Sequence, residues 1–220
     1  MELREYLRYY FLEEYLFGEV HANFEKNKTL TPEEFLAIII WKSNRSKTNV
    51  AYGIEASEKT IAELMLQVAE AEDLRKIELL SEIGGIAIPI ASAILTVCYP
   101  KKFSVVDYRS CASLAKVLGV EPKTLRKQLG GDPVAVPKAY LKYVDLCKTE
   151  AANRDLELRA FDQILWGMDF YEGEDGLKDE PLPQLSNETA HAMNGMTSSA
   201  RFIHSPTVTC LSISGIPTCH

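Results

Sequence analysis

Apolar residues recur at intervals of three and four in one stretch after another from Leu3 to Tyr171, and this spacing constrains the fold most strongly. It is the spacing of amphipathic helices, whereas half-buried strands alternate apolar and polar residues. One short extended piece, Phe103–Val106, is too isolated to form a sheet. The sequence therefore predicts an all-α protein.

Capping residues and prolines predict where several helices begin. Thr31-Pro32-Glu33-Glu34 combines a capping hydroxyl, a proline in the first turn and carboxylates at the positive helix end. The FLAIIIWK helix that follows is apolar around most of its circumference, so we expect it to be buried. Further helices are expected over Leu3–Tyr15, from Thr60 through ELMLQVAEA, and over Leu74–Ile83, Pro89–Cys98, Tyr108–Leu118, Pro122–Leu129, Pro137–Arg154 and Leu156–Phe170.

The composition changes after the last expected helix. Residues 172–220 begin charged and proline-containing, then become rich in Ser, Thr, Gly, Met and His with no regular period, as poorly ordered tails do. No apolar run approaches the roughly 20 residues of a membrane-spanning helix. The opening MELREYLRYY lacks the apolar core of a secretory signal. We therefore expect a cytoplasmic monomer that does not bind membranes.

The cysteines and histidines form no recognisable metal-binding pattern. The five cysteines have long, irregular spacings without a CxxC pair, which argues against a disulfide scaffold, a zinc site and an iron–sulfur cluster. Cys98 and Cys111 lie among apolar residues and are expected to be reduced core cysteines. We expect no metal ligands among the side chains.

The segment Ile83–Ala91 (IGGIAIPIA) is the most informative motif. Gly84 and Gly85 allow positive φ and close backbone approach, and Pro89 suits the first turn of a helix. The helix that follows would point unpaired N–H groups and its positive dipole end outward, which can bind a phosphate without any side chain. The alternative is an ordinary helix–turn–helix hairpin with a purely structural glycine turn.

The run LSEIGGIAIPIASAIL, followed by YPKKFSVVDYRSCASLAKVLG, resembles the helix-hairpin-helix DNA glycosylase superfamily of endonuclease III, MutY and AlkA relatives. Gly85-Ile86-Ala87 stands at the family's G-[IV]-G turn, and Asp107 stands where the family keeps its catalytic aspartate. The match covers Leu74–Gly119. It implies a two-lobed fold, with a helical barrel over residues 30–103 that ends in the hairpin and a second lobe from residues 1–29 and 104–171.

Three departures from the family pattern narrow the implied chemistry. Pro89 replaces the lysine that forms a Schiff base in bifunctional members, so lyase chemistry through that position is excluded. Ala87 replaces the second hairpin glycine, which hinders the monovalent cation that relatives bind at the hairpin carbonyls. The iron–sulfur cysteines are absent. The resemblance thus implies a monofunctional DNA N-glycosylase in which Asp107 alone stabilises the oxocarbenium-like sugar or orients a water.

Simpler roles remain open for these residues. Asp107 directly precedes an expected helix and would cap it well, and Arg109 could neutralise it as a surface ion pair. Two alternatives to the glycosylase follow: a non-catalytic helix-hairpin-helix protein that binds DNA, and an all-α protein-interaction module.

Charge is distributed unevenly along the chain. The net charge of −7 argues against DNA, yet Ile83–Lys148 holds ten basic and four acidic residues, giving +6 against −13 elsewhere. Binding to DNA is therefore expected at the hairpin and just beyond it. The candidate DNA-binding residues are Gly84, Gly85, Ala87, Ile88, Lys101, Lys102 and Arg109.

Trp41, Lys42 and Arg45 are candidates for a pocket around a flipped base, because an aromatic ring can stack on the base while polar groups read its edge. The alternative places Trp41 in the core, with Lys42 and Arg45 near the carbonyl end of their helix. Trp166, within ILWGMDF, is expected to be core.

Overall fold

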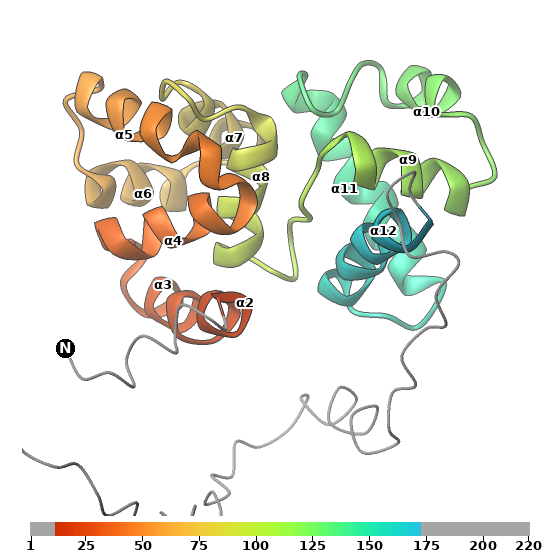
Figure 1. The fold of residues 1–220 in the computed structure, drawn as a ribbon, viewed down its shortest axis with the longest axis horizontal. Coiled ribbons are helices and arrows are strands. Elements are labelled where there is room, and N and C mark those ends of the chain that lie inside the picture. Colours follow the sequence, from red (N-terminus) through yellow and green to blue (C-terminus); the bar gives the residue numbers. More distant parts are fainter. Residues whose placement is uncertain (1–11, 173–220) are drawn as a thin grey trace, which may run out of the picture. The chain divides into compact units, whose positions relative to one another are not determined.

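The computed structural model describes residues 12–172, and every regular element in this range is a helix (Figure 1). The all-α prediction is therefore confirmed for these residues. The predicted helix over Leu3–Tyr15 falls mostly outside the described residues, and the predicted tail falls outside them except for Glu172.

The chain passes through short N-terminal helices, a group of five longer ones and a second group of four. The elements in order are α2 (Leu12–Tyr15), a π-helical stretch (Leu16–Val20), α3 (His21–Asn27), α4 (Pro32–Ser43), a 3-10 turn (Asn44–Ser46), α5 (Lys47–Ala56), α6 (Ile61–Glu70), α7 (Asp73–Ser81), α8 (Ile88–Cys98), α9 (Tyr108–Val117), α10 (Pro122–Leu129), α11 (Pro137–Ala152) and α12 (Leu158–Glu172).

Local signals explain most of these bounds. Thr31 and Thr60 each form a capping box, in which the threonine side chain and a glutamate three residues later exchange hydrogen bonds with each other's backbone amides. α10 begins at Pro122 and ends before Gly130, as predicted. α3 and α5 were not predicted, since Asn, Thr and Gly weaken the helical pattern of KTNVAYGIEA.

α8 is the central helix of the first group. All of its residues are buried except the half-buried Pro89, and α4 and α7 pack against it. In the second group α12 packs against α9 and α11 (Figure 1). Contacts between α7 and α11 join the two groups. Gln163 of α12 donates a hydrogen bond to Glu13 of α2 (2.7 Å). The boundaries of two lobes remain a prediction.

Burial departs from the sequence expectations at a few positions. Leu36 and Ile40 on α4 are 42% and 37% exposed, so the FLAIIIWK helix is only partly enclosed. Trp166 is 58% exposed, and its assignment to the core was wrong. Cys98 and Cys111 are buried free cysteines, as expected, and burial raises the pKa of Cys111 to about 12.

Candidate nucleic-acid interface

The glycine turn between α7 and α8 rests on α5. Gly85 has φ of 83°, and a Cβ added there would lie 2.7 Å from the backbone of Asn49. A Cβ on Gly53 of α5 would lie 1.9 Å from the carbonyl oxygen of Gly84. Glycine is therefore required on both sides of this contact, because two backbones touch. The unpredicted helix α5 is the support that fixes the turn.

The opposite side of the turn faces solvent. Gly84, Gly85 and Ala87 are exposed, and within residues 12–172 the amides of Gly85, Ala87 and Ile88 donate no hydrogen bond to another part of the protein. Ala87 precedes α8 with extended backbone and no capping side chain. These amides, together with the positive end of α8, could donate hydrogen bonds to an anionic oxygen and bind it.

Asp107 caps α9. Its Oδ1 accepts a hydrogen bond from the Ser110 amide (2.8 Å), while the Asp107 amide donates to Ser110 Oγ (2.9 Å). The capping role that the sequence left open is therefore real. It occupies one carboxylate oxygen and leaves the other facing α4.

Lys42 provides the partner for that second oxygen. Lys42 Nζ lies 2.6 Å from Asp107 Oδ2, and the two side chains are 14% and 23% exposed. Burial raises the pKa of Asp107, but the charge and hydrogen bond of Lys42 and the hydrogen bonds from Ser110 outweigh it, so the pKa is lowered. The carboxylate is therefore ionised at neutral pH.

A serine in α8 links this ion pair to the hairpin. The amide of Val106 donates to Ser92 Oγ (3.0 Å), and Ser92 Oγ donates to the carbonyl of Pro89 (2.8 Å). Asp107 thus follows directly a residue that is bonded to the first turn of α8. The hairpin helix and the aspartate, separated in the sequence, belong to one local structure.

Arg109 lies apart from this pair. It is exposed, with its Nη1 3.4 Å from Asp169 Oδ2 on α12, and its Nε donates to the hydroxyl of Tyr108 (2.9 Å). Lys42, and not Arg109, therefore neutralises Asp107 by direct contact.

The three residues expected around a flipped base are in different surroundings. Trp41 is partly buried against the core, edge-on to Phe17 (5.6 Å between ring centroids) and 5.5 Å from the guanidinium of Arg159. Lys42 is bound to Asp107, and Arg45 is exposed in the 3-10 turn after α4. The hollow described below contains none of the three.

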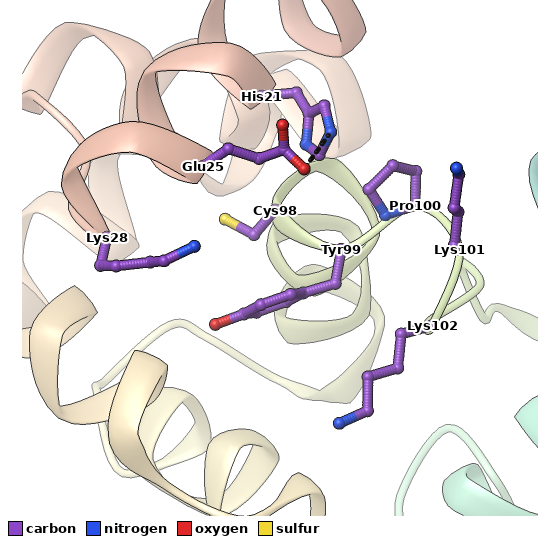
Figure 2. Close-up of a pocket in the computed structure, with 8 residues that line it drawn as sticks. All are labelled: His21, Glu25, Lys28, Cys98, Tyr99, Pro100, Lys101 and Lys102. Carbon is purple, nitrogen blue, oxygen red and sulfur yellow. Dashed lines mark ion pairs between the residues drawn. The ribbon is translucent and has the colours of Figure 1, made fainter.

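Lys101 and Lys102 lie beyond the other end of α8, where they line a hollow of about 390 Å³ (Figure 2). Lys102 pairs with Asp73 (2.6 Å). The eleven residues of α8 span about 16 Å, so these lysines are not neighbours of the hairpin amides. The hollow is lined by His21, Glu25, Lys28, Cys98, Tyr99, Pro100, Lys101 and Lys102.

Residues 12–172 contain neither a cluster of metal-binding side chains nor a membrane-spanning helix. No group of three or more His, Cys, Asp or Glu side chains in this range is arranged to hold a metal ion. No helix in it has the length and apolar character needed to cross a membrane.

Comparisons with known proteins give no relative: no family model matches the chain, and no curated protein and no solved structure matches it.

Proposed function

We propose that this protein binds DNA through the α7–α8 hairpin and acts in base-excision repair, as a monofunctional N-glycosylase whose catalytic group is Asp107. The observation that carries the proposal is the connection from the open hairpin amides through Pro89 and Ser92 to Val106 and Asp107. A phosphate at the turn would bring the neighbouring sugar toward this carboxylate.

Binding would depend on backbone groups more than on the predicted side chains. Lys102 and Arg109 both have carboxylate partners within the protein. By contrast, the amides of Gly85 and Ala87 have no hydrogen-bond acceptor among residues 12–172. Unpaired amides at the N-terminal end of a helix bind phosphate oxygens well, because they donate hydrogen bonds to them.

The chemistry follows from the charge of Asp107. When the base leaves with the bonding electrons, positive charge develops on the sugar, and a nearby carboxylate stabilises it. Water then adds to the sugar carbon and loses a proton, and the departed base gains one. Lys42 and Ser110 keep the carboxylate ionised and fixed in direction. Pro89 has no side-chain amine, so no Schiff base can form at that position.

Substitutions at Ala87 test the binding step. Serine and aspartate both cap a helix well, so Ala87→Ser and Ala87→Asp should both preserve stability. Aspartate also places a negative charge where the phosphate would bind, and we expect DNA affinity to fall at least about tenfold. Fluorescence anisotropy with a duplex at fixed salt measures this. Equal affinity for the two variants would exclude the hairpin as the binding site.

Excision assays on duplexes with alkylated, deaminated or oxidised bases test the catalytic step. Asp107→Asn is the matched variant, because asparagine caps α9 equally well but carries no charge. We expect excision in the wild type and its loss in Asp107→Asn, with DNA affinity retained.

A non-catalytic DNA-binding protein is the second candidate, and the Lys42–Asp107 ion pair is the observation that favours it. A carboxylate bound on both oxygens has a structural role even without a substrate. DNA binding that is sensitive to Ala87→Asp, with no excision of any lesion, would support this candidate.

A further inference from the structure

The segment Phe103–Asp107 has no helix or strand, runs as an extended stretch between α8 and α9 (Figure 1) and is largely buried. A buried extended backbone must find other partners for its amides and carbonyls. Here the partners are mostly side chains from distant helices. Tyr140 Oη donates to the carbonyl of Ser104 (2.9 Å), and Tyr143 Oη donates to the carbonyl of Val105 (3.3 Å).

Asp162 of α12 makes the densest set of these contacts. It is 4% exposed, and its Oδ1 accepts from Ser104 Oγ (2.9 Å) and from the Val105 amide (3.0 Å). Its Oδ2 pairs with the guanidinium of Arg159. One buried carboxylate thus fixes the backbone two residues before Asp107.

Arg159, which pairs with Asp162, also contacts α4, the helix that carries Lys42. The Arg159 guanidinium lies over the rings of Phe17 (4.3 Å) and Trp41 (5.5 Å). Trp41 is the chain neighbour of Lys42, whose amine reaches Asp107. Contacts and chain connections together form a closed ring. Asp162 contacts Val105, which lies two residues before Asp107; Asp107 pairs with Lys42; and Trp41, next to Lys42 in the chain, contacts Arg159, which pairs with Asp162.

We propose that Asp162 is a positioning residue that holds both members of the Lys42–Asp107 pair in place. It fixes Asp107 through the extended segment and Lys42 through the Arg159–Trp41 stack. Its relevance to base excision rests on the proposed function, but the positioning itself can be measured without DNA.

The site requires a carboxylate and not an amide. Asparagine at position 162 could still accept the hydrogen bonds of Ser104 and Val105 through its oxygen. Its NH₂ group would then face the Arg159 guanidinium, which can only donate. Asp162→Asn should therefore weaken the contact with Arg159 alone. Asp162→Ala should also remove the hydrogen bonds with Ser104 and Val105.

The pKa of Asp107 distinguishes positioning from simple electrostatics. Removing a negative charge at position 162 would by itself lower the pKa of Asp107, because a like charge has gone. Losing the alignment with Lys42 would raise that pKa, because Asp107 stays partly buried without its partner. The two explanations predict shifts of opposite sign.

The experiment is a pH titration of the Asp107 side-chain carboxyl by ¹³C NMR, with its signal assigned from the Asp107→Asn spectrum. We expect the pKa to rise in Asp162→Asn and further in Asp162→Ala. Glu150→Gln is the matched control, because it removes a carboxylate with a 15% exposed side chain that pairs with Arg154 outside the ring. That control should leave the pKa of Asp107 unchanged.

Two milder variants keep the test decisive if the Asp162 variants do not fold. Tyr140→Phe and Tyr143→Phe each remove one hydrogen bond to the segment without changing charge, and each should raise the pKa of Asp107 by a smaller amount. An unchanged or lowered pKa in every folded variant would overturn the proposal.

Excision assays connect the result to function. If the wild type excises a lesion, Asp162→Asn should slow excision about tenfold or more while DNA affinity stays the same. If the wild type excises nothing, the proposed glycosylase activity fails, but the titration still decides whether Asp162 positions the pair.

Discussion

At the N-terminal end of α8 the exposed residues form a glycine turn whose Gly85 and Ala87 amides donate no hydrogen bond within residues 12–172, whereas the C-terminal end carries lysine side chains around a hollow. The lysine end has the larger formal charge. However, Lys102 is already paired with Asp73, and His21 lies beside Glu25 (3.5 Å) with its Nδ1 3.0 Å from the carbonyl oxygen of Val97.

This difference shows that formal charge in a sequence is a poor measure of what a surface can still bind. Cations at the C-terminal end of a helix are stabilised by its carbonyls and by nearby carboxylates. Within residues 12–172, the amides of Gly85, Ala87 and Ile88 at the N-terminal end donate no hydrogen bond. A phosphate should therefore prefer the end of α8 that carries fewer charged side chains.

The largest expected effect comes from Gly53→Ala, which would disrupt the contact between α5 and the glycine turn. The new methyl group would collide with the Gly84 carbonyl, and we expect a loss of about 3 kcal/mol in the free energy of unfolding. Urea denaturation measures it. Gly167→Ala in α12 is the control, because its Cβ meets nothing within 4 Å, and it should stabilise by up to about 1 kcal/mol.

Lys42→Met, which removes the ion pair with Asp107, should have the next largest effect on the free energy of unfolding. Asp107 would keep a partly buried charge without its partner, and we expect about 2 kcal/mol of destabilisation at pH 7. Lys148→Met, which removes a looser surface pair with Asp145 (3.7 Å), should cost less than about 0.5 kcal/mol.

The pH dependence of Lys42→Met sharpens this prediction. The pKa of Asp107 is lowered in the folded protein, so its stabilising contribution is present above the ordinary aspartate pKa and is lost as the pH falls through the lowered value. Without Lys42 burial raises the pKa of Asp107, so the stability difference between wild type and Lys42→Met should shrink as the pH falls toward about 4 and below. A difference that is constant with pH would contradict the ion-pair explanation.

The smallest effect is expected at the lysine end of α8. Replacing both Lys101 and Lys102 by glutamine should leave the salt dependence of DNA binding unchanged, because neither lysine lies beside the hairpin amides. If both contacted phosphates, the slope of log affinity against log salt would fall by roughly two. Anisotropy titrations at several salt concentrations decide between these outcomes.

Much of the fold was predictable because helix boundaries are encoded locally. Thr31, Thr60 and Pro122 each begin a helix where the sequence predicted one. α5 was missed because its stability comes from packing against the glycine turn and not from its own residues. Trp166 was misassigned because Leu158, Phe161 and Leu165 define the buried face of α12, and Trp166 lies on its flank.

The candidate site was predictable only in part. The glycine turn and Asp107 have a local signature, and the capping of α9 by Asp107 follows from its position before the helix. The contacts of Asp107 with Lys42 and of Asp162 with Ser104 join residues 65 and 58 positions apart. One sequence holds no signal for such pairs, since a buried aspartate and a surface aspartate read alike.

The extended segment before Asp107 also has a consequence for the order of folding. Its partners Ser92, Tyr140, Tyr143 and Asp162 are 14 to 58 residues away in the chain. Contacts between distant residues form only after the intervening chain has closed, and helices form much sooner. We therefore expect the segment to become ordered late, when α11 and α12 dock, so that an intact Lys42–Asp107 pair would report the end of folding.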